Sequence, residues 1–364
     1  MIVTTTRQHT LRQHLPGTTT IRAASSVEHQ AALAARLTAR DKWLLALLHE
    51  HRVLTSTHVL NAAFPSGRSA RQRLRELYLW RAISRFQPFR QLGSAPMHYV
   101  LGPAGAAVLA AEHGLAVTDL GYRHDRAMAI AHNQRLAHTV GVADFFTSLI
   151  ARTRYPPPNP TSPASEAVTA WWSEARCARH FGDLVIPDAY GRWRSHHGEL
   201  EFFLEFDTGT ESLTKVSRKL TAYARLADST GIATPLLFWI PTTRRETGAR
   251  AALSRIHTGL DDRDAVPVAT ASADQLNPDA PHPSPADEVW LPLTADRTPR
   301  SSPRLGLGEL PAAWPRLQPT ATASSEDQVG ERGEDETVAS AYRLPPPRPI
   351  PPEASPNRQR HTGH

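Results

Sequence analysis

Cysteine is almost absent from this sequence, which has 364 residues and one cysteine, Cys177. A single thiol excludes an internal disulfide and a zinc site built from several cysteine ligands. Long apolar runs are absent as well. No stretch approaches the roughly 20 apolar residues of a membrane-spanning helix, and residues 1–20 lack the apolar core of a signal peptide. We therefore expect a soluble cytoplasmic protein that has no membrane partner.

Lysine is also scarce. Of the 41 basic residues only three are lysines, namely Lys42, Lys215 and Lys219. Two of these fall in one short segment, and an ammonium group is a compact charge that the planar guanidinium of arginine does not replace at every site. We therefore expect a specific role for the segment that contains them.

Positive charge is in excess, with a formal net charge of +6 and an isoelectric point near 9.8. Clustered positive charge favours binding to nucleic acid, because it releases counterions from the phosphate backbone. The composition therefore predicts double-stranded DNA as a partner. The alternative is a basic protein whose charge serves only its solubility.

The ends of the chain differ in composition from its middle. Residues 267–364 hold many of the 31 prolines, together with serine and an acidic run. Such a segment buries too few apolar groups to offset the entropy of ordering it. We expect a disordered Pro-rich and acidic tail there, with Trp290 and Trp314 as isolated apolar residues. Residues 1–36 are expected to be a flexible arm, in which a helix can begin near Ser26.

Residues 37–115 show the element order of a winged helix-turn-helix. The first helix has Thr38 as its cap, and a short helix follows over residues 55–63. Ser66 can cap a third helix. Two strand-like runs joined by a turn come next and would form the wing.

The third helix, residues 67–79, turns arginines away from its apolar stripe. In a winged helix-turn-helix this helix enters the major groove, and the wing reaches phosphate or the minor groove. The alternative is a helical protein-interaction domain whose exposed helix is rich in arginine. The expected DNA-binding residues are Arg68, Arg71, Gln72 and Arg75 on the helix and Arg85 and Arg90 on the wing.

Residues 125–257 are expected to form an α/β domain with the element order αβββαβ. Helical and strand-like periodicities alternate along this stretch. The expected elements are a helix at 127–152, strands at 167–175, 184–190 and 199–207, a helix at 211–228, a strand at 234–240 and a further helix at 245–256.

A group of acidic residues and a lysine could meet at one edge of this sheet. Side chains alternate along a strand, so Glu205 and Asp207 share a face, and the register of the preceding strand decides whether Asp188 lies near them. Mg²⁺ prefers such oxygen ligands. Lys219 borders the buried stripe of the next helix and can lean toward the carboxylates, whereas Lys215 points further away. The alternative is a set of surface carboxylates beside a solvated helix face.

Three other residues carry a weaker signal. Glu174 can lie near the same sheet edge, but a plain surface acid is the simpler interpretation. His132 and His138 are six residues apart and do not share a helix face, so we do not expect them to form a metal pair.

The element order, with Pro187-Asp188 and an ExD pattern ending at Asp207, resembles the PD-(D/E)xK nuclease-like fold. Asp207 stands where that family normally has its lysine, either as an extra metal ligand or as the mark of a lost lysine. Some members supply the lysine from the next helix, which implies Lys219 as the replacement. The resemblance implies Asp188, Glu205, Asp207 and Lys219 as catalytic residues, with Mg²⁺ on Asp188 and Glu205.

A second resemblance rests on five stretches: LTARDKWLLALL, AHNQRLAHTVGVADFF, WWSEA, PDA and FLEFDTGTESLTKVSRKLTAY. They make residues 37–256 similar to the replication-relaxation family of plasmid and mobile-element proteins. The resemblance implies roles in plasmid replication or DNA relaxation, with replication or mobilisation proteins as partners. Two functions remain open: a Mg²⁺-dependent DNA phosphodiesterase, and a non-catalytic DNA-binding or regulatory factor with a decayed nuclease fold.

The sequence therefore predicts an α/β protein. Its N-terminal winged helix-turn-helix is followed by a PD-(D/E)xK-like αβββαβ domain and a disordered Pro-rich tail.

Overall fold

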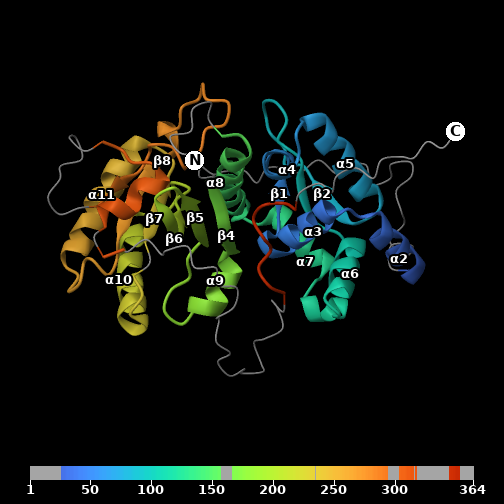
Figure 1. Cartoon of the computed structure of the whole chain (residues 1–364), viewed down its shortest axis with the longest axis horizontal. Helices are drawn as coiled ribbons and strands as arrows, with labels where there is room; N and C mark the ends of the chain where they lie inside the picture. The colour runs from blue at the N-terminus through green and yellow to red at the C-terminus, as the bar shows by residue number, and fades with distance from the viewer. Residues whose placement is uncertain are drawn as a thin grey trace.

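The structure of the protein is a computed structural model, and it describes residues 26–156, 166–233, 235–293, 303–314, 316–317 and 344–352. In Figure 1 a group of helices from the first third of the chain lies on one side, and a six-stranded sheet with its own helices lies on the other. A long helix, α8 (Leu136–Arg154), stands between them. The fold is thus a mixed α/β arrangement in two parts.

The N-terminal part combines short helices with a small antiparallel sheet. Thr38 and Asp41 form the expected capping box, and Ser66 caps the arginine-bearing helix through the backbone N–H of Ser69. The strands lie in the order β1-β3-β2. The elements are α2 (Val27–Arg36), α3 (Ala39–His51), β1 (Leu54–Thr55), α4 (Ser56–Ala63), α5 (Gly67–Leu79), β2 (Ile83–Phe86), β3 (His98–Leu101) and α6 (Pro103–Glu112).

The helix expected over residues 127–152 is divided. It begins as α7 (His124–Ala129) and the 3-10 turn η2 (Ile130–His132), and α8 starts only at Leu136. The side chain of Asn133 accepts a hydrogen bond from the backbone N–H of Arg135 at 2.8 Å. An asparagine that satisfies the backbone in this way favours a turn over a continuous helix.

The second part is built on a sheet in the order β4-β5-β6-β7-β8-β9. Strands β4, β5 and β6 are antiparallel neighbours, β6, β7 and β8 are parallel, and β9 is antiparallel to β8. Its elements are β4 (Ala167–Ser173), α9 (Glu174–Phe181), β5 (Ala189–Ser195), β6 (Gly198–Phe206), α10 (Leu213–Thr230), β7 (Leu236–Ile240), α11 (Thr243–Thr258), β8 (Val268–Ser272) and β9 (Leu291–Pro292).

Helices cover both faces of this sheet. Alternate residues of β6 separate into two apolar clusters: Phe202 packs with Phe146 of α8, while Phe203 packs with Tyr223 of α10. The α8 cluster continues into the N-terminal part, where α4 packs against α8. The two parts therefore share one continuous core.

Three boundaries in the second part differ from those predicted. Helix α9 was not expected, and residues 184–188 precede β5 instead of belonging to it, with Leu184 and Ile186 exposed. Helix α10 begins at Leu213, after the cap Ser212, and not at residue 211. Ser212 is favoured because its hydroxyl accepts from the backbone N–H of Lys215, which satisfies an otherwise unpaired donor of the first turn.

The expectation of disorder over residues 267–364 is wrong for the part of that range that the structure describes. Every residue of β8 is buried in the sheet, and Trp290 is 0% exposed. Pairing with β7 and β9 explains this, because it satisfies the backbone of β8, while its side chains join the two apolar clusters and α11 packs against it. Trp314 is also buried, beside the 3-10 helix η4 (Leu307–Ala313). The acidic run lies outside the described residues.

The helix that the sequence allowed from near Ser26 is confirmed as α2, which has Ser26 as its cap and Leu33 in the core. Residues 1–25 lie outside the described residues. No helix within the described ranges is long and apolar enough to cross a membrane.

Residues 344–352 lie between the two parts (Figure 1). The Trp43 indole N–H on α3 donates to the Arg348 carbonyl at 2.7 Å, and Arg176 Nη2 on α9 donates to the Leu344 carbonyl at 3.0 Å. Arg176 also forms a buried ion pair with Glu50 of α3 at 2.7 Å. This proline-rich segment therefore contacts both parts of the molecule.

Candidate functional site

The register between β5 and β6 brings two of the predicted carboxylates together. Ala189 pairs with Leu204 in this antiparallel ladder. Asp188 precedes Ala189 and Glu205 follows Leu204, so these two acidic residues face each other across the strands. Asp188 is further held by the backbone N–H of Phe206, which donates to Asp188 Oδ2 at 2.8 Å.

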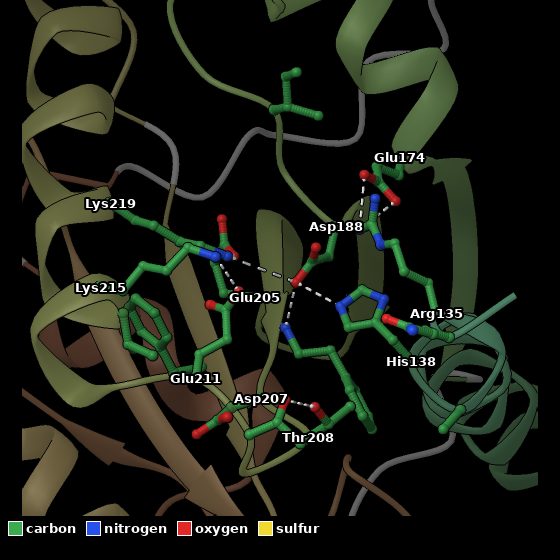
Figure 2. A pocket seen from close by; sticks show the side chains of 17 residues that line it. Arg135, His138, Glu174, Asp188, Glu205, Asp207, Thr208, Glu211, Lys215 and Lys219 are labelled. Atoms are coloured by element: carbon green, nitrogen blue, oxygen red, sulfur yellow. Dashed lines mark hydrogen bonds and ion pairs between the residues drawn. The ribbon is translucent and has the colours of Figure 1, made fainter. Parts of the chain in front are cut away.

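Helix α10 supplies a lysine to this pair (Figure 2). Lys219 forms an ion pair with Glu205, and its Nζ lies 4.0 Å from Asp188 Oδ2. One turn later, the Tyr223 hydroxyl donates to Glu205 Oε1 at 2.6 Å. Glu205 is only 2% exposed and has both oxygens in use within the protein.

Two further ligand-type side chains reach Asp188 from the opposite side. His138 Nε2 at the start of α8 lies 3.1 Å from Asp188 Oδ2, and Glu174 begins α9 close by. One ligand atom from each of these three residues lies within 4.8 Å of the other two. In its present position Glu174 is also paired with Arg135 at 2.9 Å. A nitrogen and two carboxylates at this spacing form a group that could hold a divalent metal ion.

The approach of α8 to the sheet explains how His138 reaches this point. Gly141 lies against the ring of Phe206, where a β-carbon would collide with the ring. The His138 ring contacts the same Phe206 edge-on, with 5.8 Å between ring centroids. The glycine therefore lets α8 lie close to β6 and places His138 at the sheet edge.

The environment pushes the pKa values of the two carboxyl groups in opposite directions. Burial would raise the pKa of Asp188, but the hydrogen bond from His138 and the charge of Lys219 outweigh it and hold that pKa below its usual value. Burial raises the pKa of Glu205 to about 8, and repulsion from Asp188 adds to the effect. Asp188 is therefore the carboxylate that stays ionised, and Glu205 is the one that takes up a proton more readily.

Lys219 remains a cation in this group. Burial alone would lower its pKa, but the neighbouring carboxylates Glu205 and Asp188 outweigh burial and raise the pKa above its usual value. The site therefore presents a positive charge directly beside the ionised Asp188.

Asp207 does not join this group. It forms an ion pair with Arg245 of α11, whose Nη2 lies 2.9 Å from Asp207 Oδ1, and it accepts the backbone N–H of Gly209 at 2.7 Å. Both of its oxygens are thus engaged away from Asp188. Lys215, which the sequence placed further from the site, pairs with Glu211.

The site opens into a cavity of about 680 Å³ that reaches from α8 to α10. Asp188, Glu205 and Lys219 line it together with His138. A second cavity of about 250 Å³ shares His138 and Asp188 with the first and extends toward α3. The carboxylates thus lie where a ligand from solvent can approach them.

Of the predicted DNA-binding residues, one is half-buried and the others are exposed to solvent. Arg85 is half-buried and stacks on Tyr78, with its Cζ 4.2 Å from the ring centroid. Arg73 of α5, which the sequence analysis did not single out, is held by Asp41 and Glu76. The exposed members are Arg68, Arg71, Gln72 and Arg75 on α5 and Arg90 between β2 and β3.

Sequence reasoning missed the contacts of His138 and Tyr223 with the acidic pair. His138 was weighed only against His132, although its true neighbour, Asp188, lies 50 positions later in the chain. Tyr223 belongs to the buried stripe of α10, so its apolar ring explained its position without a role in the site. Its spacing of four residues from Lys219 was the available signal, because residues i and i+4 lie on one face of a helix.

The family model described as Replication-relaxation matches residues 45–241, more than half of the chain. No curated protein and no solved structure matches the chain.

Proposed function

The chain belongs to the replication-relaxation family, and on that basis we propose that it is a plasmid-associated DNA-processing protein. Its N-terminal part binds duplex DNA, and its second part hydrolyses a phosphodiester bond with a divalent cation at Asp188.

The proposal treats the N-terminal part as a winged helix-turn-helix. Helices α3, α4 and α5 followed by the β2–β3 ribbon have the element order of that motif. Helix α5 would be the recognition helix, because it carries three exposed arginines on one side while Leu74 and Leu77 anchor the other. Such arginines can donate to guanine edges or to phosphates in the major groove.

The proposal treats the second part as a PD-(D/E)xK-like domain. Its support is the placement of Asp188, directly before β5, opposite Glu205 of the adjacent β6, with Lys219 of α10 beside both. Lys219 then takes the role of the lysine that the motif normally carries where this chain has Asp207.

Each residue of the site has a defined task in this proposal. His138, Glu174 and Asp188 would hold the cation, which would polarise the scissile phosphate and lower the pKa of an attacking water. Lys219 would stabilise the extra negative charge of the transition state. Glu205 and Tyr223 would be positioning residues, because Glu205 holds Lys219 and Tyr223 holds Glu205.

Mg²⁺ remains the expected ion for the phosphodiesterase. The sequence assigned it to Asp188 and Glu205, but the hydrogen bonds of Glu205 to Lys219 and Tyr223 favour His138 and Glu174 as the partners of Asp188. Mn²⁺ shares the preference of Mg²⁺ for carboxylate oxygens. Activity should therefore be measured with both ions.

The observation that carries the proposal is the ammonium group of Lys219 beside the ionised Asp188. A nicking assay on supercoiled plasmid with Mg²⁺ or Mn²⁺ tests it. Nicking is expected in wild type and in Lys215→Ala, and it should be lost in Asp188→Ala and Lys219→Ala. Absence of metal-dependent nicking by wild type at micromolar protein, with DNA binding retained, would sink the phosphodiesterase.

The second candidate is a non-catalytic DNA-binding or regulatory factor. It is favoured by Asp207, which occupies the motif's lysine position and is fully engaged with Arg245. In that case the Lys219–Glu205 ion pair is purely structural. Retained DNA binding without nicking would support this candidate.

Gel-shift assays test the DNA-binding head separately. Arg71→Ala combined with Arg75→Ala should weaken duplex binding and make it less dependent on salt, because phosphate or base contacts are lost. Arg225→Ala combined with Arg255→Ala removes the same charge from exposed positions on α10 and α11 and serves as the matched control. Unchanged affinity of the α5 variant at physiological salt would refute the role of α5.

A further inference from the structure

Helix α3 ends at a residue with an unusual backbone conformation. Arg52 has φ +69°, one of two non-glycine residues with positive φ in the part of the chain that the structure describes. L-residues with side chains rarely adopt this region because the β-carbon crowds the backbone, whereas glycine adopts it freely. Backbone strain of this kind often accompanies a functional position, so the surroundings of the Arg52 side chain are informative.

Arg52 lines a cavity of about 200 Å³ at the junction of α3 and α7. Arg123 and Arg126 also line it, together with His49 and Tyr122. Three guanidinium groups around one hollow concentrate positive charge, and guanidinium groups bind phosphate through paired N–H donors.

This charge is only partly neutralised by the protein. Arg123 pairs with the exposed Asp125 at 2.7 Å. For Arg52 and Arg126 no acidic partner within 4.0 Å is found among the described residues. Burial lowers the pKa of His49, which therefore adds no charge near neutral pH. The hollow thus has an excess of positive charge that suits an anion.

The basic hollow shares one lining residue with the cavity beside the metal-ligand group. Arg52 also lines the cavity of about 250 Å³ that His138, Glu174 and Asp188 line. That second cavity in turn shares His138 and Asp188 with the main cavity in front of Lys219. Neighbouring hollows thus share lining residues in a series that runs from α10, past Asp188, to Arg52 and Arg126, and this series is called the path below.

We propose that this path binds a single strand of DNA, with phosphates at Arg52, Arg123 and Arg126 and the strand leading to Asp188. The inference rests on the proposed function, since it extends the same site to its substrate. A duplex is too wide to enter hollows of this volume, whereas a single strand can be laid along them nucleotide by nucleotide. Duplex binding stays with α5, and the path receives a separated strand.

Fluorescence anisotropy of the full chain tests this path, with a labelled single-stranded oligonucleotide of roughly 20 nucleotides. EDTA keeps the strand intact, so the result does not depend on any cleavage. The Arg52→Gln/Arg126→Gln variant is compared with wild type and with the matched Arg225→Gln/Arg255→Gln variant. The log–log salt slope of the path variant should be shallower by about 1.4, or about 0.7 for each lost phosphate contact on a single strand.

Weaker single-strand binding by the path variant alone, with duplex binding retained, supports the proposal. Unchanged single-strand affinity would overturn it, and so would an equal loss in the control variant or an equal loss of duplex binding. Failure of plasmid nicking bears on the phosphodiesterase and leaves this binding result intact.

Arg52→Gly separates a ligand role from a structural one. Glycine relieves the positive-φ backbone, so the melting temperature should not fall. Single-strand binding should still weaken, because the guanidinium is gone. A variant that melts lower and binds normally would show that Arg52 serves only the fold and would overturn its place in the path.

Discussion

Lys219 Nζ lies 4.0 Å from Asp188 Oδ2 while it forms an ion pair with Glu205. A lysine from α10 therefore reaches the carboxylate that stays ionised, although β6 carries no lysine of its own. The position of this ammonium group depends on Glu205 and on Tyr223, one turn further along the helix.

Replacing Lys219 by methionine should abolish most of any nicking activity. Loss of one donor that stabilises transition-state charge typically lowers the rate about 10²- to 10³-fold. Lys219→Arg should not restore it, because the planar guanidinium does not fit the site of a compact ammonium. Single-turnover nicking measures the effect, with Lys215→Met as control. Equal rates for the Lys219 and Lys215 variants would contradict this role.

Replacing Tyr223 by phenylalanine should destabilise the fold. The hydroxyl is the partner of a buried Glu205 oxygen, and leaving such a group unpaired costs about 1–3 kcal/mol. Urea unfolding measures the change. Tyr122→Phe removes a half-buried hydroxyl that donates to the Leu101 carbonyl at 3.1 Å and serves as the comparison. A larger loss in the Tyr122 variant would argue against a special role for Tyr223.

Removing His138 should weaken metal binding. Among the described residues, His138, Glu174 and Asp188 form the candidate metal-ligand group, and His138 is its only nitrogen ligand. The His138→Ala chain lacks this ligand. The affinity of this variant for Mn²⁺ should fall about 10- to 100-fold or more. Removal of a residue that only supports a metal ligand already costs that much, and His138 would be a ligand itself. Isothermal titration calorimetry measures this, and His132→Ala, an exposed histidine six residues earlier, should bind as wild type does. Identical affinities in all three proteins would exclude His138 as a ligand.

Replacing Glu205 by glutamine should change how stability depends on pH. The pKa of Glu205 rises from its usual 4.5 to about 8 on folding, so between these values the folded chain holds a proton that the unfolded chain has released. This contribution is complete below pH 4.5 and is lost as the pH rises to about 8. Urea unfolding across this range should show wild type losing stability relative to Glu205→Gln. Parallel curves would mean that the pKa is not raised.

Removing residues 344–364 should loosen the contact between the two parts of the molecule. The indole N–H of Trp43 then loses its acceptor, and Arg176 loses one of its acceptors. Water can replace part of the lost hydrogen bonding, so we expect the free energy of unfolding to fall by about 1 kcal/mol. The melting temperature should then be about 2–4 °C lower. A chain ending at residue 352 is the control and should melt as wild type does. No difference between the two truncated chains would show that the segment does not stabilise the fold.

Local sequence patterns predicted much of the fold and part of the site. The alternation of β6 placed Glu205 on the face covered by α10, and the caps Thr38 and Ser66 marked two helix starts. These features depend on backbone geometry over a few residues, which the sequence carries directly. The prediction of disorder over residues 267–364 failed at β8, because composition gives only the average polarity of a long segment. Five residues of β8 pair with β7, and this pairing orders the strand.

The sequence by itself determined which residues could form the site: an acidic pair at the sheet edge and Lys219 on the bordering helix face. Only the tertiary structure decided that Asp188 faces Glu205, that His138 joins Asp188, and that Asp207 is bound by Arg245. Each of these outcomes depends on strand register or on the packing of α8 and α11. Such contacts join segments far apart in the chain, and they arise only when the apolar faces of helices and sheet are buried together.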